Sequence, residues 1–275
     1  MKRLLVSCLT MLIWANSLAQ SNYNFPGGIA EFKITKQSSN LPEVKFGLRE
    51  PVIIDVKGYW KVLIGLDLNL LPGEYVSYIK NEISDTEDTI GEHKTVLVRQ
   101  MIYPFVQLER TNTPSNSWPI RLEHEDFSDI DFANTQQPSL PLKFPFEGDW
   151  SNTFGHKMYD TNSDTLHVPN SITVTTTRLG TVVAPQSAIV SKIKQTSDGS
   201  YTVFLDHGRG LYSVISGLDD LTIEIGNGIV AGAVIGKLPS NRNNGKQTMS
   251  TKRLVWQTVL NGTYVNPFIL TELEP

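Results

Sequence analysis

The side chains that could bind a metal ion or move a proton are few and widely spaced in this sequence. Its 275 residues include five histidines and one cysteine. A structural or catalytic zinc site needs several nitrogen, sulfur or carboxylate ligands within reach of one another. His156 and His167 are the candidates for such a site, and no carboxylate stands at ligand spacing to them. We therefore expect no metal ion and no cofactor, and a zinc site with displaced ligands is the alternative.

Other kinds of catalysis have little support. A glycosidase needs two carboxylates at a working distance. The sequence gives no means of placing two of the candidate acids at that distance: Asp164, Asp206 and Asp219. Ser213 and Ser216 lack the strand–turn–helix context of a nucleophilic serine. Residues 183–193 and 230–235 are similar to half of a lipoyl or biotinyl carrier, but no lysine flanked by methionine lies on a hairpin there.

The most informative side chains lie on a predicted strand near the C-terminus, at residues 254–260. Alternate residues of a strand point to opposite faces of a sheet. We expect Leu254 and Trp256 to face the core, because both are large and apolar. The residues then expected on the opposite face, lining a groove, are Arg253, Val255 and Gln257.

Short β-branched and aromatic runs separated by turn signals recur along the chain. They predict strands at 29–35, 52–56, 60–64, 74–79 and 95–102, and then at 180–184, 188–194, 201–206, 211–215, 221–225, 229–235 and 254–260. No run has helical periodicity of useful length. We predict an all-β protein with a small β-sandwich-like domain at residues 20–107, a proline-containing linker at 108–142 and a second β-sheet domain at 143–275.

The N-terminus has the pattern of an exported protein. Lys2 and Arg3 precede an apolar run that is too short to span a bilayer, and Ser17-Leu18-Ala19 follows it as a cleavage site. We predict a signal peptide at residues 1–19, cleavage after Ala19, a periplasmic or secreted protein and no transmembrane segment afterwards. The 24 basic and 28 acidic residues give a net charge of −4, which argues against a nucleic-acid partner.

Motifs in the second half occur in a fixed order with consistent spacing. They lie at residues 144–155 (FPFEG to SNTFG), 169–185 (PNSITV to LGTVVAP), 206–210 (DHGRG), 211–218, 224–236 (EIGNGIVAGAVIG) and 253–267. This part of the chain resembles the lysostaphin/LytM-type zinc endopeptidases, peptidase family M23. Residues 25–29 and 71–74 look similar to the β-domain that precedes the peptidase in many Gram-negative members. The resemblance implies a LytM-type β-sheet domain, also called a duplicated hybrid motif.

The resemblance also implies a zinc ion held by two histidines and an aspartate, with further histidines that move protons. Here Asn170 and Val255 replace the histidine ligands, Val174 replaces the aspartate, and Gly217 and Arg253 replace the other histidines. Valine has no donor atom, and a guanidinium is neither a metal ligand nor a general base at neutral pH. We expect a pseudo-peptidase, not an enzyme, with Val174, Gly217 and Val255 as an uncharged floor beside Arg253.

Two functions follow from this resemblance. The favoured one is a non-catalytic module of the cell envelope that binds peptidoglycan or regulates a cell-wall hydrolase, since degenerate LytM-type proteins are thought to activate amidases. Its candidate binding residues are Arg253, Gln257 and His167. The alternative is an active zinc-dependent peptidoglycan endopeptidase with displaced ligands.

Overall fold

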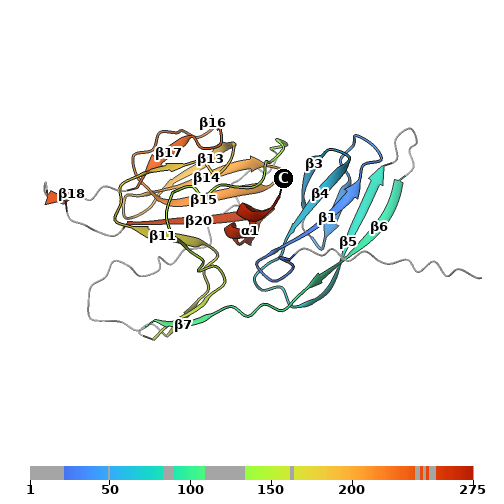
Figure 1. Ribbon diagram of the computed structural model, residues 1–275, viewed down its shortest axis with the longest axis horizontal. Coiled ribbons are helices and arrows are strands. Elements are labelled where there is room, and N and C mark those ends of the chain that lie inside the picture. Colours follow the sequence, from blue (N-terminus) through green and yellow to red (C-terminus); the bar gives the residue numbers. More distant parts are fainter. Residues whose placement is uncertain are drawn as a thin grey trace, which may run out of the picture.

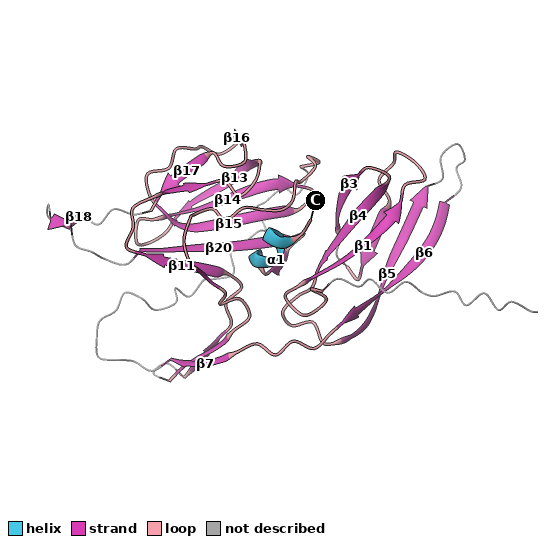
Figure 2. Cartoon of the chain, in the orientation of Figure 1, coloured by secondary structure: helices cyan, strands magenta, loops and turns pink. Residues whose placement is uncertain are grey.

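The regular secondary structure of the described residues is almost all β-strand, as predicted. The computed structural model describes residues 22–48, 50–82, 89–108, 134–161, 164–238, 242–243, 246–247 and 252–274, so the predicted signal peptide lies outside the described residues. Within them the single helix is α1 (Pro267–Glu272), close to the C-terminus (Figure 2). No helix in this part of the chain is long and apolar enough to cross a membrane.

The N-terminal domain is a sandwich of two three-stranded antiparallel sheets. One has the order β1 (Ile29–Thr35), β4 (Tyr59–Gly65), β3 (Val52–Val56), and the other β2 (Glu43–Phe46), β5 (Gly73–Glu82), β6 (Thr89–Val98). Apolar residues alternate along β1 and β4, so one face of that sheet can be buried against the second sheet. The buried side chains between the sheets are Ala30, Phe32, Ile34, Val44, Ile53, Trp60, Val62, Ile64, Leu66, Ile79, Val96 and Val98.

The C-terminal domain is centred on a large antiparallel sheet (Figure 1). Its strands lie in the order β16 (Gly228–Ile229), β13 (Ala188–Gln195), β14 (Tyr201–Gly208), β15 (Leu211–Leu218), β20 (Lys252–Leu260), β11 (Ile172–Thr176) and β8 (Trp150–Ser151), and β21 (Thr263–Val265) also pairs with β20. One face of this sheet is buried in the main apolar core, which includes Val203, Ile215, Leu254 and Trp256.

Three smaller sheets complete the structure. β12 (Thr181–Val183) pairs with β17 (Val234–Lys237), and β18 (Arg242–Asn243) pairs with β19 (Lys246–Gln247). β7 (Phe105–Leu108) runs parallel to β9 (Lys157–Asp160), which pairs with β10 (Thr165–His167). This last sheet links the end of the N-terminal domain to the C-terminal domain.

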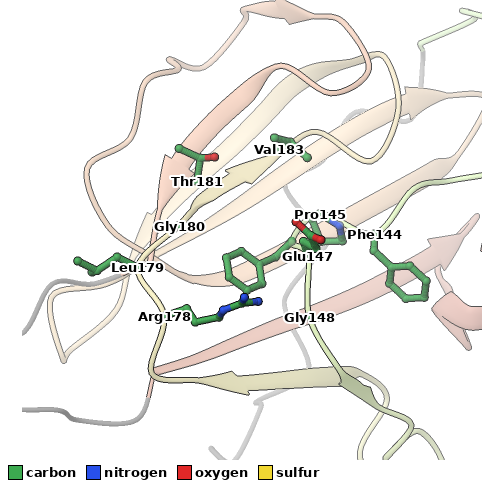
Figure 3. Close-up of a pocket in the computed structure, with 10 residues that line it drawn as sticks. Phe144, Pro145, Glu147, Gly148, Arg178, Leu179, Gly180, Thr181 and Val183 are labelled. Atoms are coloured by element: carbon green, nitrogen blue, oxygen red, sulfur yellow. The ribbon is translucent and has the colours of Figure 1, made fainter.

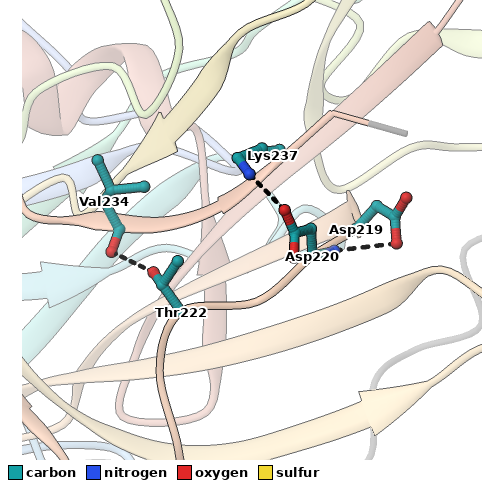
Figure 4. A network of polar contacts seen from close by, with 5 residues as sticks. All are labelled: Asp219, Asp220, Thr222, Val234 and Lys237. Carbon is teal, nitrogen blue, oxygen red and sulfur yellow. Dashed lines mark hydrogen bonds and ion pairs between the residues drawn. The ribbon is translucent and has the colours of Figure 1, made fainter. Parts of the chain in front are cut away.

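Two predicted strands differ in the structure: residues 229–235 are divided between β16 and β17 by a turn, and residues 221–225 form a loop. The loop is fixed to β17 by polar contacts. The Thr222 hydroxyl donates to the Val234 carbonyl at 2.7 Å (Figure 4). Asp219 pairs with Lys237 through two backbone hydrogen bonds of 2.7 and 2.8 Å. The Lys237 ammonium also pairs with the Asp220 carboxylate. The Thr222 amide also donates to the Ile235 carbonyl at 3.2 Å, but these bonds to β17 do not form a continuous ladder.

The two domains share one continuous apolar cluster. The face of the β1-β4-β3 sheet that points away from the sandwich contributes Val52, Ile54 and Leu63, and the C-terminal segment contributes Val265 and Leu270. Polar bonds reinforce this contact: the Tyr23 hydroxyl donates to Glu272 at 2.7 Å, and the Asn266 amide donates to the Gly27 carbonyl at 3.0 Å. The relative orientation of the domains is therefore set by buried side chains.

The described part of the predicted linker also packs against the C-terminal domain. Leu140 and Leu142 are buried in the main core, and the Leu142 amide donates to the Leu270 carbonyl at 2.9 Å. The Arg209 amide donates to the Asn134 carbonyl at 2.8 Å. Residues 134–142 thus contribute to the C-terminal core, and residues 109–133 of the predicted linker lie outside the described part of the chain.

Candidate functional site

The central strand β20 presents Arg253 and Val255 on the face of the sheet opposite to the main core. Cross-strand partners share a face, and β11 places Thr175 opposite Arg253 and Thr173 opposite Val255. On the other side of β20, Ser216 lies opposite Val255. We call this surface the Arg253 face, made of Thr173, Thr175, Val214, Ser216, Arg253, Val255 and Gln257. Leu254 and Trp256 lie in the main core, as the alternation predicted.

Most of the Arg253 face is closed to solvent. Val255 and Gln257 are 1% and 0% exposed, and Thr173 is also buried. Only its end is accessible, where Thr175 is exposed and Arg253 is half-buried. The predicted open floor at Val255 is therefore covered, and a ligand from solvent would meet Arg253 and Thr175 first.

Val174 does not belong to this face, and the expectation that it would form the floor beside Arg253 is wrong. It lies opposite Leu254 on β20 and opposite Trp150 on β8, so its side chain points into the main core, where it is 1% exposed. The physical reason is the register of β11 against β20, which aligns residue 174 with an inward-facing position.

At Gly217 the backbone of β15 lies so close to β20 that there is no room for a side chain. Gly217 has φ of +91°, a conformation that favours glycine, and it lies at an irregularity between β14 and β15. A Cβ atom added at this position would lie 2.3 Å from the backbone oxygen of Arg253. A histidine cannot occupy position 217 without a rearrangement of β15 against β20.

Asn170 is held by a buried hydrogen bond. The Gln257 side-chain amide donates to its Oδ1 atom at 2.6 Å, and the two residues are 0% (Gln257) and 6% (Asn170) exposed. Gln257 Oε1 is buried without a hydrogen-bond partner among the described residues. The Gln257 side chain is thus closed to solvent and engaged with Asn170, which does not favour its predicted role in ligand binding. Both positions stand out in the sequence, but their 87-residue separation hides that their side chains pair.

Arg253 is the cation at the accessible end of this face. Its burial lowers the pKa of the guanidinium, since burial disfavours the charged form. The ordinary pKa of arginine is so high that the side chain stays positive at neutral pH. Arg253 can donate hydrogen bonds in a fork to a carboxylate, but it cannot act as a general base.

The histidines do not gather into one site. His167 lies on β10 opposite Met158, in the small sheet with β7 and β9, and His156 follows the turn at Gly155. Burial lowers the pKa of His156. Across the described ranges, no three histidine, cysteine, aspartate or glutamate side chains lie close enough to hold a metal ion together.

His207 is buried in the sheet as part of a hydrogen-bond network. Its Nδ1 atom lies 3.0 Å from the Ser187 carbonyl oxygen and its Nε2 atom lies 2.9 Å from the Ser213 hydroxyl. Next to it, Tyr212 donates to the Asp206 carboxylate at 2.9 Å, and the Gly208 amide donates to the same carboxylate at 2.8 Å. These bonds order the turn between β14 and β15.

The residues present do not fit a zinc ion. Of the positions that resembled the zinc site, Val174 and Val255 have no donor atom, and Val174 lies on the opposite side of the sheet. Asn170 has its side-chain oxygen engaged by Gln257, and Gly217 has no side chain. A cation at Arg253 would repel a second cation nearby. No chemical step through zinc follows from this arrangement.

Comparisons with known proteins agree with the fold. The family model for peptidase family M23 matches residues 168–267. No curated protein matches the sequence. Among solved structures, a putative peptidase M23 from Pseudomonas aeruginosa is similar with a TM-score of 0.62 and 20% identity, over 91% of this chain and 96% of that chain. This likeness shows the same fold along nearly the whole chain.

Two further structures match with lower scores. They are a zinc containing peptidase from Vibrio cholerae, with TM-score 0.41, 9% identity and coverage of 74% of this chain and 58% of that chain, and the catalytic domain of the antimicrobial peptidase lysostaphin from Staphylococcus simulans, with TM-score 0.36, 15% identity and coverage of 46% and 92%. The part of the chain that the family model matches, residues 168–267, also carries the Arg253 face.

Proposed function

We propose that this is an exported cell-envelope protein whose M23 domain does not cleave peptide bonds and instead binds peptidoglycan or regulates a cell-wall hydrolase. The observation that carries the proposal is the buried hydrogen bond between Gln257 and Asn170. This bond engages Asn170 Oδ1, which is the one side-chain oxygen among the positions that resembled the zinc site. The other four of those positions carry valine, glycine and arginine, which supports binding in place of metal-assisted hydrolysis.

The accessible end of the Arg253 face suits an anionic partner. A half-buried guanidinium is partly desolvated, so its hydrogen bonds to a carboxylate are stronger than those of a fully hydrated cation. The exposed hydroxyl of Thr175 stands opposite it on β11. Peptidoglycan stem peptides and acidic loops of a partner protein both supply carboxylates. With either partner, the protein would act in the cell envelope.

Metal analysis together with digestion of isolated cell wall tests the loss of catalysis. We expect the purified protein without its signal peptide to hold no stoichiometric zinc and to release no muropeptides. A matched experiment after incubation with zinc salts guards against loss of a weakly held ion. Binding of about one zinc ion per chain, together with cleavage that a chelator stops, would contradict the proposal and support an endopeptidase with displaced ligands.

The Arg253→Ala variant tests the binding surface. Loss of a charge-assisted hydrogen bond should weaken association with isolated cell wall, or with a hydrolase that the protein activates, by roughly 1.5–3 kcal/mol. The melting temperature should change little, because the guanidinium lies at the accessible end of the sheet. Lys57→Ala, in the turn between β3 and β4, removes an exposed positive charge far from this face and serves as the control. Equal binding by the parent and both variants would exclude the Arg253 face as the contact.

A further inference from the structure

A second candidate binding site lies away from the Arg253 face. It is a pocket of about 770 Å³ between residues 144–148, which precede β8, and residues 178–183, which lead into and form β12 (Figure 3). One of its lining residues, Gly148, lies against Val174, whose side chain points into the main core. The wall of the pocket therefore contacts the core side of the large sheet, and the Arg253 face lies on the other side.

The pocket forms where two paired segments separate. The Lys143 amide donates to the Pro185 carbonyl at 2.9 Å and the Val183 amide donates to the Pro145 carbonyl at 2.8 Å. Beyond the second bond the two segments diverge, and the pocket occupies the space between Glu147 and Thr181. The backbone is thus fixed at the inner end of the pocket before any ligand is present.

The wall of the pocket is built around the ring of Phe146. A Cβ atom at Gly180 would lie 2.5 Å from this ring, and one at Gly148 would lie 3.5 Å from it and 3.0 Å from Val174. Only glycine at position 180 leaves room for the ring. The Phe146 carbonyl also accepts a hydrogen bond of 3.0 Å from the Trp150 indole. These contacts give the pocket a rigid apolar wall.

Two opposite charges face the pocket from its two sides. Arg178 extends from one segment and Glu147 belongs to the other (Figure 3). Among the described residues the two side chains form no ion pair with each other or with a neighbour. Both are exposed, so each can meet a ligand group from solvent.

We propose that this pocket binds a free amino acid or a short peptide in its zwitterionic form, with the carboxylate at Arg178 and the ammonium at Glu147. A simple anion would be repelled by Glu147, and a simple cation would be repelled by Arg178. A dipolar ligand satisfies both, and the guanidinium matches a carboxylate in geometry. The volume lies within the range of small-ligand pockets, roughly 300–1,000 Å³, and the Phe146 wall can contact an apolar side chain.

Calorimetric titration with three forms of one tripeptide tests the proposal. The probes are tri-alanine with free ends, N-acetyl-tri-alanine, which lacks the ammonium, and tri-alanine amide, which lacks the carboxylate. We expect saturable binding of the free peptide and binding at least ~10-fold weaker for each capped form, because each lacks one charge-assisted contact.

Variants assign each charge to its partner. Arg178→Gln should abolish the preference for the free carboxylate but keep the preference for the ammonium, and Glu147→Gln should do the reverse. Lys57→Gln should bind all three probes as the parent does. Absence of saturable binding, equal affinity for free and capped peptides, or unchanged selectivity in both pocket variants would overturn the proposal. Since Arg253 takes no part in these contacts, failure here leaves the proposed function of the Arg253 face to its own tests.

Discussion

At the scale of single residues, His207 is a buried imidazole whose environment favours the neutral form. Burial lowers its pKa from 6.5 to about 4, and the hydrogen bond to the Ser187 carbonyl opposes this shift in part. A neutral ring with its proton on Nδ1 satisfies both neighbours, since it donates to Ser187 and accepts from the Ser213 hydroxyl. A second proton would place a charge inside the sheet, where water cannot solvate it.

This shift predicts a pH dependence of stability. The unfolded chain takes up a proton on this histidine below pH about 6.5, whereas the folded chain resists until about pH 4. The contribution of neutral His207 to the free energy of unfolding is therefore fully present above pH 6.5 and is lost as the pH falls from 6.5 to 4. It amounts to on the order of 3 kcal/mol. Urea unfolding between pH 4 and pH 7 measures it.

His207→Gln should flatten this part of the stability profile, although the variant should be less stable at pH 7 because a buried network is altered. His156→Gln is the matched control. His156 is partly exposed and its pKa is also lowered by burial, so this variant should keep most of the slope. A parent profile that is level between pH 4 and pH 6.5, or a His207→Gln profile with the parent slope, would show that another group governs acid stability.

At the scale of elements, the register of β11 against β20 separates the positions that a zinc site would need to bring together. Asn170 approaches the Arg253 face through Gln257, whereas Val174 faces the core with Leu254. A one-residue shift of a strand moves its side chains to the opposite face. Substitutions alone cannot bring these positions onto one face, because the backbone pairing decides where each side chain points.

We therefore expect that restoring the ligand types will not restore a site. The double variant Asn170→His/Val255→His places two imidazoles on one side of the sheet and should bind zinc weakly. Adding Val174→Asp should not increase zinc affinity, because its carboxylate would lie in the core beside Phe146 and Leu254. Burial of an unpaired carboxylate should also lower the stability at pH 7 by several kcal/mol.

Zinc titration by calorimetry and urea unfolding measure the two effects in the double and triple variants. Thr175→Asp, added to the double variant in place of Val174→Asp, is the control, since Thr175 shares the Arg253 face and is exposed. It should strengthen zinc binding with little loss of stability. Tighter zinc binding by the variant with Asp at 174 than by the one with Asp at 175 would refute the register described for β11.

At the scale of the whole molecule, the β1-β4-β3 sheet is shared by two cores. Along β4, Trp60, Val62 and Ile64 face the sandwich, while Lys61 and Leu63 face the C-terminal domain. Lys61 is 3% exposed, lies 3.5 Å from Glu31 and donates to the Glu274 carbonyl. Because these contacts are buried, the domains should unfold together.

Calorimetry of the parent should show a single transition, and Leu63→Ala should shift it as a whole. The substitution removes a fully buried side chain from the shared cluster and should cost roughly 2–5 kcal/mol. Hydrogen exchange in β20 should then accelerate together with exchange in β4. Val76→Ala, at a position that is 58% exposed on β5, is the control and should leave the transition temperature and the exchange rates unchanged. Two separate transitions, with only the first moved by Leu63→Ala, would mean that the domains unfold independently.

The sequence by itself determined the fold class and the family-like motifs. Alternation of apolar residues located β1 and β3 at the same limits as the structure, and it assigned Leu254 and Trp256 to the core. These features depend on local periodicity and on turn residues, which one strand carries without reference to its neighbours. The types of residue at the positions that resemble the zinc site were also clear from the sequence, since a ligand atom is present or absent in any conformation.

Tertiary structure alone decided which side chains meet. Val174 was expected beside Arg253, but the pairing of β11 with β20 turned it to the core, and Gln257 was expected to meet a ligand, but it bonds Asn170, 87 positions away in sequence. The pocket between Glu147 and Arg178 likewise depends on two segments that pair and then separate. Register and long-range contacts depend on how distant strands pack together, so no single strand's pattern contains them.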